Sequence, residues 1–354
     1  MRRAWRYDMQ ISTITPILDK ICLGNDLTEN ESFVQFCTLA EGNLNPIEMA
    51  AFLTALKAKG ETIDEITGAV HALRKVAVPF PQSQKLKNNH IIVDCAGTGG
   101  DGLQTLNIST AVAIMLSCAG VKVAKHGNRA VSSKCGTADL LAHCGVNIEC
   151  SPMTAKKSLE QTGICFLFAP HYHVGAQFVK EVRSTLKVRT IFNLLGPLLN
   201  PLQPDYQLIG VYDPKLCHPL AQVLKNLHIK KALVIHGSGL DEIAIHGSTV
   251  GALLNNGEIT DFSISPEEVG LERYPIEAIR GNDVDHNRTA FLALLRGNGE
   301  TAFRASVSIN AGTLLWLVNS VSSIQEGIKL IQSLLNTNAG YLKLHQFIEA
   351  SHAR

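Results

Sequence analysis

The hydrophobic period of this chain changes near residue 90, and this change restricts its possible folds more than any other feature. From residue 12 to about 80, apolar residues recur every three or four positions, which is typical of amphipathic helices. Asn45 and Pro46 are expected to begin one helix as its cap and first-turn proline, and Gly60 to end it. The run Val78–Pro81, with its two prolines, then stops the pattern. A small N-terminal helical bundle is therefore expected.

Beyond this point, short runs rich in β-branched residues alternate with helical segments. Helices are expected around 109–119, 136–144 and 151–163, and the tail from residue 283 is expected to be mainly helical. The first of these helices would have a hydroxyl side chain as its cap. Such alternation is typical of a mainly parallel sheet covered by helices on both faces, so the fold class is α/β. Strands are expected at 91–93, 121–124, 164–168, 207–211 and 232–235, followed by a hairpin that turns at 255–257.

Composition limits the function classes that fit. The 354 residues suggest about two domains, and 45% hydrophobic against 18% charged residues argues against extensive disorder. The formal charge of +1 provides no global attraction to nucleic acid or an anionic membrane. The nine cysteines are odd in number and never spaced C-x-x-C, which indicates reduced thiols. We therefore expect a cytoplasmic protein without a membrane segment or secretory signal, whose residues 1–10 have no assigned role and whose true start could be Met9.

A glycine-rich loop from Asp94 to Gly102 joins the first expected strand to the following helix. Its glycines match G-x-G-x-x-G, the dinucleotide-binding pattern, which alone is equally compatible with a mere turn. Asp101 would repel a bare pyrophosphate, so a divalent cation or a ribose hydroxyl is expected between them. The second strand ends in Lys125-His126, where a dehydrogenase would carry an acid for the ribose.

Two further segments are rich in hydrogen-bond donors. Asn107–Thr110 stands at a helix N-terminus, a favourable place for phosphate, although Ser109 or Thr110 could simply cap the helix. Lys125–Ser133 follows the second strand. Because ligands of open parallel sheets bind beyond the carboxyl ends of the strands, these loops should meet at one crevice. They indicate a multiply phosphorylated sugar or nucleotide as the ligand.

At this point the chain resembles a known family, the anthranilate phosphoribosyltransferases. The resemblance extends from about residue 12 to 340 and implies a small helical domain plus a larger α/β domain of the nucleoside phosphorylase and phosphoribosyltransferase type. The matching blocks are Gly97–Asp101, Asn107–Thr110, Lys125–Ser133, Phe168–His173, Arg183, Arg189–Pro201 and Gly239–Glu242.

The resemblance implies transfer of the phosphoribosyl group from 5-phosphoribosyl 1-pyrophosphate (PRPP) to the amine of anthranilate, in tryptophan biosynthesis. It implies Mg²⁺, expected as two ions, held by Ser109, Asp241 and Glu242, and acceptor binding by Gly97, Asn128, Arg183 and His173. No residue is assigned as an acid or base, because the anthranilate amine is itself the nucleophile. The residues implied in donor binding are Gly97, Gly100, Asp101, Thr105, Asn107, Ser109, Thr110, Lys125, His126, Gly127, Asn128, Arg129, Ala130, Val131, Ser132, Ser133 and Thr137.

The resemblance also implies how the domains are divided. Residues 1–83 and 175–199 would form the helical domain, which carries the acceptor side and the homodimer contact, and residues 84–174 and 200–354 the α/β domain. Hinge closure between the two would complete the site. Two departures from the family pattern are Val174, where proline often follows the histidine, and the segment 280–288, where the family tends to carry paired glycines. The alternatives left open are a pyrimidine nucleoside phosphorylase, a nucleic-acid-binding paralogue and an NADP-dependent oxidoreductase.

Overall fold

The computed structural model describes residues 14–130 and 134–353. Val131, Ser132 and Ser133 of the expected donor set, and the segment 1–10 with Met9, lie outside the described residues. None of the helices in the described ranges combines the length and the apolar character that crossing a bilayer requires.

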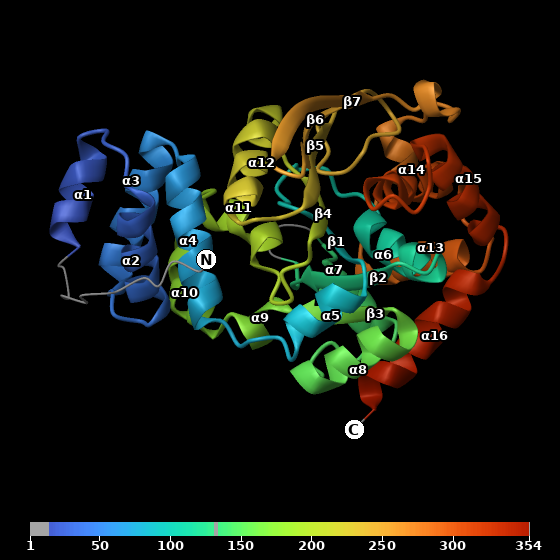
Figure 1. Cartoon of the computed structure of the whole chain (residues 1–354), viewed down its shortest axis with the longest axis horizontal. Coiled ribbons are helices and arrows are strands. Elements are labelled where there is room, and N and C mark those ends of the chain that lie inside the picture. The colour runs from blue at the N-terminus through green and yellow to red at the C-terminus, as the bar shows by residue number, and fades with distance from the viewer. Residues whose placement is uncertain (1–13, 131–133, 354) are drawn as a thin grey trace.

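The expected N-terminal helices are confirmed. Asn45 caps α3 by accepting hydrogen bonds from the backbone N–H groups of Ile47 (2.9 Å) and Glu48 (3.0 Å), and Gly60 ends it with φ of 94°. Phe36 and Phe52 are fully buried between the helices, with ring centroids 5.4 Å apart. The four helices are α1 (Thr15–Cys22), α2 (Glu29–Ala40), α3 (Pro46–Lys59) and α4 (Ile63–Val76), which stand together at one end of the molecule (Figure 1).

The α/β part is built on one seven-stranded sheet of order β3-β2-β1-β4-β5-β6-β7. The first five strands in this order are parallel, and β6 and β7 form the expected antiparallel hairpin. The strands are β1 (Ile92–Gly97), β2 (Lys122–Gly127), β3 (Ile164–Phe168), β4 (Tyr206–Gly210), β5 (Lys231–Gly237), β6 (Thr249–Asn255) and β7 (Glu258–Ile264).

Both faces of the sheet are covered, as predicted. Along β5, Leu233 and Ile235 pack into one hydrophobic cluster, whereas Ala232 and Val234 pack into another on the opposite face, as the two-residue period of a strand requires. The covering helices are α5 (Ser83–Asn89), α6 (Ile108–Cys118), α7 (Thr137–His143), α8 (Pro152–Thr162), α12 (Cys217–Asn226), α13 (Val284–Leu295), α14 (Thr301–Leu317), α15 (Ile324–Leu335) and α16 (Ala339–His352) (Figure 1).

Between β3 and β4 the chain returns to the helical bundle through α9 (Ala169–Tyr172), α10 (Gln177–Leu186), α11 (Phe192–Leu195) and the 3₁₀ helix η2 (Gly196–Leu199). Each carbonyl of η2 accepts a hydrogen bond from a side chain of a different element. The donors are His126 Nδ1 to Gly196 (3.2 Å), Gln207 Nε2 to Pro197 (3.2 Å), Arg74 Nη2 to Leu198 (2.7 Å) and His173 Nε2 to Leu199 (2.8 Å). Side chains from both parts of the molecule thus fix this segment.

One local prediction is wrong. The helix expected from residue 109 was assigned a hydroxyl cap, but α6 begins at Ile108 and its N-cap residue, Asn107, makes no side-chain capping bond. The Ser109 hydroxyl instead accepts a hydrogen bond from Lys125 Nζ (3.1 Å). The physical reason is that a buried ammonium without a hydrogen-bond acceptor costs more free energy than a helix end without a side-chain cap.

Candidate active site

The two expected ligand loops meet at one edge of the sheet. They follow β1 and β2, which are adjacent and parallel, so their carboxyl ends coincide. Lys125, at the end of β2, is 2% exposed and links the two segments. Its Nζ donates to the Cys95 carbonyl (2.8 Å) as well as to Ser109 Oγ. A cation is thereby held beside the N-terminus of α6, which itself favours anions.

The glycine loop is shaped by a close approach of Asp241. A Cβ at Gly97 would lie 2.0 Å from Asp241 Oδ2, so a side chain there would displace the Asp241 carboxylate. The Gly99 N–H donates to the same oxygen (2.7 Å), and Gly99 and Gly100 have φ of 66° and 81°, which L side chains rarely adopt. The loop after β5 therefore joins the loops after β1 and β2.

Three carboxyl groups crowd together at this point. Burial, then the charge of Asp101, raises the pKa of Asp241 to about 7, and burial, then the charge of Asp241, raises that of Glu242 to about 8. Burial also raises the pKa of Asp101. Carboxyl groups in this arrangement resist ionisation unless a cation lies among them. The cluster therefore has the electrostatics of a cation site.

The chemistry of these residues fits Mg²⁺. Ser109, Asp241 and Glu242 offer a hydroxyl and two carboxylates. Over the described part of the chain, no group of three or more His, Cys, Asp or Glu residues could hold a metal by itself. Mg²⁺ is commonly held by one or two carboxylates together with substrate phosphates, so the donor set fits a metal that binds with its substrate.

The second donor loop is closed by Asp139 of α7, a residue that the sequence analysis did not select. Its Oδ2 accepts from the backbone N–H of Ala130 (2.9 Å) and of Gly136 (3.0 Å), and its Oδ1 pairs with Arg129 Nη1 (3.2 Å). Arg129 also lies over the Phe168 ring, 5.8 Å from its centroid. The sequence contains a signal for this residue, because an Asp three residues after a turn glycine commonly lies in the first turn of a helix.

Further expected donor residues lie around the start of α6. Thr110 Oγ1 donates to Thr137 Oγ1 (3.4 Å), and Asn107 Nδ2 donates to the Cys135 carbonyl (3.2 Å). Thr105 pairs through its backbone with Arg280, in the segment that departs from the family pattern. A Cβ at Gly127 would lie 3.0 Å from the Phe166 ring. These contacts bring Thr105, Asn107, Thr110 and Thr137 to the same edge as Ser109.

His126 and His173 face each other behind the loops. Their rings are 5.3 Å apart in an edge-on arrangement, and they are 6% and 7% exposed. Burial lowers the pKa of His126 to about 3 and that of His173 to about 4. Both imidazoles donate to η2, which is the geometry of an anchor between the loop and the interdomain segment.

The expected acceptor residues are less closely gathered. Arg183, half-buried on α10, lies over the Phe192 ring, 5.3 Å from its centroid. The exposed Asn128 accepts a hydrogen bond from the Arg129 N–H (2.8 Å) through its Oδ1. In the described ranges no hydrogen bond or ion pair joins Arg183 to either donor loop. The structure alone therefore does not bring Arg183 to the donor loops.

Arg189 contacts the glycine loop directly, although it had no assigned role. Its Nη2 donates to the Gly100 carbonyl, and its guanidinium lies over the Tyr212 ring, 4.2 Å from the centroid. Its position in the matching block Arg189–Pro201 was the available signal. Through this residue the segment that returns from the helical bundle reaches the glycine loop.

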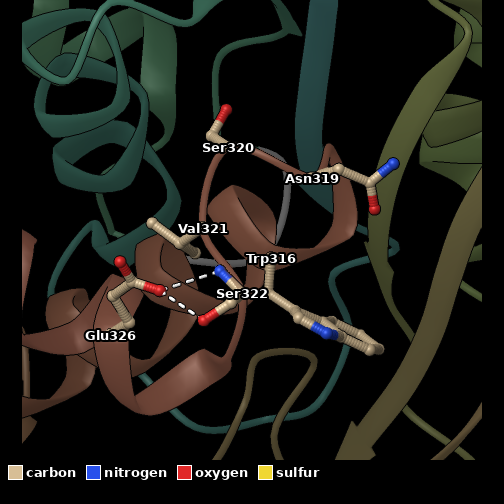
Figure 2. Close-up of a pocket in the computed structure, with 6 residues that line it drawn as sticks. All are labelled: Trp316, Asn319, Ser320, Val321, Ser322 and Glu326. Atoms are coloured by element: carbon tan, nitrogen blue, oxygen red, sulfur yellow. Dashed lines mark hydrogen bonds between the residues drawn. The ribbon is translucent and has the colours of Figure 1, made fainter.

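Figure 2 shows a separate surface depression where α14 turns into α15. Trp316 and Asn319 lie on one side, and Glu326 accepts hydrogen bonds from the N–H (2.8 Å) and the hydroxyl (2.6 Å) of Ser322. None of the residues lining it belongs to the loops described above. We therefore place the candidate active site at the carboxyl edge of the sheet.

Family models match both parts of the chain. The model of the glycosyl transferase family, helical bundle domain, matches residues 15–77, and that of the glycosyl transferase family, a/b domain, matches residues 89–340. Together with the donor-rich loops beside an acidic cluster, these matches define a glycosyl transferase of two-domain architecture.

Similar proteins narrow this class. An anthranilate phosphoribosyltransferase of Shewanella denitrificans is 47% identical over 335 residues, covering 95% of this chain and 92% of the relative. Another, of Shewanella loihica, is 46% identical over 343 residues, covering 97% and 98%. The crystal structure of the enzyme from Thermus thermophilus superimposes with a TM-score of 0.87 at 36% identity, covering 95% of this chain and 99% of that one. This chain belongs to the anthranilate phosphoribosyltransferase family.

A more distant structure shows the same fold. Anthranilate phosphoribosyltransferase from Saccharomyces cerevisiae in complex with PRPP and Mg has a TM-score of 0.85 at 24% identity, covering 98% of this chain and 99% of that one. At this identity the likeness concerns the fold alone.

Proposed function

We propose that this protein transfers the 5-phosphoribosyl group of PRPP to the amine of anthranilate, giving N-(5-phosphoribosyl)anthranilate and pyrophosphate in tryptophan biosynthesis. Family membership supports this activity. The structural observation that carries it is the meeting of three loops, after β1, β2 and β5, at one edge of the sheet. There Lys125 and the α6 N-terminus favour a phosphate, while Asp241 and Glu242 favour a cation.

The donor is held in this proposal by both loops. Backbone N–H groups of the glycine loop and of the start of α6 bind phosphate oxygens, and the Lys125 ammonium adds a charge fixed 3.1 Å from Ser109 Oγ. Asp101 accepts from a ribose hydroxyl. Because these groups are positioned before the substrate arrives, little reorganisation remains when charge develops at C1 of the ribose.

Ser109, Asp241 and Glu242 hold Mg²⁺ in this proposal, with two ions present when the donor is bound. The metal would neutralise pyrophosphate oxygens and so stabilise the departing group. The raised pKa values of Asp241 and Glu242, about 7 and about 8, support this assignment, since a bound cation would favour their ionised forms.

The acceptor approaches from the helical side. Arg183 pairs with the anthranilate carboxylate through its forked guanidinium, with Gly97, Asn128 and His173 nearby, so that the amine faces C1. The reaction needs no nucleophilic side chain, because the amine itself displaces pyrophosphate. Closing of the helical part over the sheet would bring Arg183 to the donor and exclude water.

The expected division into domains supports this closure. Residues 175–199 leave the sheet domain and pack with the helical bundle: Val179 and Leu195, both fully buried, share a hydrophobic cluster with α2 and α3. Leu23 and Ile47 are 79% and 82% exposed on the bundle, which supports a homodimer contact there. We further propose a cytoplasmic location, on the basis of the reduced-thiol composition.

The decisive experiment is the initial rate at which anthranilate fluorescence is lost when PRPP is added, with Mg²⁺ and then with excess chelator. We expect loss that requires both PRPP and the metal. Folded protein that leaves anthranilate unchanged under all conditions would refute the proposed function. Calorimetry with PRPP would then show whether a donor site exists with a different acceptor.

A further inference from the structure

We propose that Asn287 is a positioning residue that fixes the donor site by joining both of its loops to the C-terminal segment, an inference that rests on the proposed function. Asn287 lies on α13 and is 2% exposed. Its Nδ2 donates to Asn107 Oδ1 (2.9 Å), and its Oδ1 accepts the Asn282 N–H (2.9 Å). Both ends of the amide are therefore used, and its orientation is fixed.

Asn107 carries this constraint into the second loop. Its Oδ1 also accepts from Cys135 Sγ (3.5 Å), and its Nδ2 donates to the Cys135 carbonyl. The carboxamide of Asn107 thus has one N–H left for a ligand, and its other hydrogen bonds link two segments of the chain. Asn107, the residue before α6, is thereby bonded to the end of the loop after β2. Because Asn287 holds the Asn107 side chain, the separation of the two loops depends on Asn287.

The backbone around Asn287 supports the same arrangement. Gly281 N–H donates to the Gln104 carbonyl (2.6 Å), and a Cβ at Gly281 would lie 2.4 Å from the Thr105 carbonyl oxygen. The Asn282 side chain accepts a hydrogen bond from Lys134 Nζ (3.1 Å). Asn282 thereby adds one more link between the C-terminal segment and the loop after β2.

The physical consequence is preorganisation. If the loops are held apart at a fixed distance, PRPP does not have to order them on binding, whereas a loosened pair must be ordered at the expense of affinity. Asn287 contacts neither Arg183 nor Asn128 in the described ranges. Loss of the Asn287 side chain should therefore raise the KM for PRPP and leave the KM for anthranilate nearly unchanged.

The test is steady-state kinetics of Asn287→Ala with each substrate varied in turn. We expect the KM for PRPP to rise about tenfold, the loss of roughly one good hydrogen bond, and the KM for anthranilate to change less than twofold. Asn287→Ser is polar but too short to reach Asn107, so we expect it to raise the KM for PRPP as Asn287→Ala does. It replaces the alanine variant in the test if that variant does not fold. An unchanged PRPP KM in either folded variant would overturn the proposal.

Asp283→Ala is the matched control. Asp283 caps the same helix, accepting the His286 N–H (2.9 Å), so its loss weakens α13 without removing a contact to either loop. If Asp283→Ala raises the PRPP KM as much as Asn287→Ala, the effect is general loosening of the helix and the inference is wrong. Should the wild-type protein not consume anthranilate, calorimetric PRPP affinity of the same variants tests the inference separately from the proposed function.

Discussion

Arg183 is a half-buried cation that packs against an aromatic ring. Burial lowers the pKa of its guanidinium, and its neighbour Phe192 offers a ring face rather than a charge. No carboxylate of the described chain lies within ion-pair distance of it. A planar anion such as anthranilate would supply the missing partner and match the fork of the guanidinium.

We expect Arg183→Ala to raise the KM for anthranilate far more than the KM for PRPP. Loss of a hydrogen bond to a charged group costs about 1.5 to 3 kcal/mol, which corresponds to about one to two decades in kcat/KM. Initial rates with each substrate varied in turn at a saturating level of the other measure both constants. Lys180→Ala, which removes an exposed cation from the same helix, should leave both constants unchanged. Equal effects of Arg183→Ala on the two substrates would contradict the acceptor assignment.

At the scale of elements, the helix ends show how closely local sequence controls structure. In α3, the Asn45 side chain accepts hydrogen bonds from the N–H groups of Ile47 and Glu48, while the Glu48 carboxylate accepts one from the Asn45 N–H (2.9 Å). These bonds satisfy donors that have no partner within the helix. They involve only neighbours along the chain, which is why the beginning of this helix could be predicted.

The cap of α3 leads to a prediction about stability. We expect Asn45→Ala to lower the free energy of unfolding by about 1 kcal/mol, measured as a lower urea midpoint, with unchanged kinetics because the Asn45 side chain bonds only the first turn of its own helix. Asn43→Ala is a suitable control, since the Asn43 side chain makes only an exposed contact with Glu41 (3.3 Å). Equal midpoints for the wild type and Asn45→Ala would show that the capping box does not stabilise the bundle.

At the scale of the whole molecule, η2 joins the helical bundle to the sheet. His126 of β2, Gln207 of β4 and Arg74 of α4 all donate to its carbonyls, as does His173. Moving this segment relative to the sheet or the bundle would break four hydrogen bonds, two of them buried and two partly buried, so these bonds oppose its displacement.

The buried His173 predicts a pH dependence of stability. Its pKa is about 4 in the folded protein against an ordinary value of 6.5, because burial disfavours the charged ring. Between these values the unfolded chain binds the extra proton, so the contribution of His173 to stability falls as the pH drops below 6.5, and it is opposed over the same range by Asp241 and Glu242, whose pKa values are raised in the folded protein. From pH 8 to pH 5 this should cost roughly 2 kcal/mol.

His173→Gln keeps a donor for the Leu199 carbonyl but cannot titrate. We expect its free energy of unfolding, measured in urea at pH 8 and pH 5, to decline less than that of the wild type. His126, with a pKa lowered to about 3, keeps a similar dependence in both proteins. An identical decline in the two proteins would show that His173 can take up a proton without unfolding.

The local elements, the α/β class and the family could all be predicted from the order of the residues. Asn45-Pro46 begins a helix, β-branched runs form buried strands, and the blocks around Gly97, Lys125 and Arg189 indicate the family, because each depends on residues close together in the chain. Asp101 beside an expected phosphate already suggested a divalent cation or a ribose hydroxyl between them.

The groups from distant parts of the chain that complete the site became apparent in the folded molecule. Asp241 reaches Gly99 across 142 positions, and Asn287 reaches Asn107 across 180. The Ser109 hydroxyl, expected to cap its helix, bonds Lys125 of the adjacent strand instead. Such contacts depend on how strands pair and helices pack, and the free energy of burying a charge or an amide outweighs the local preference of the residue that satisfies it.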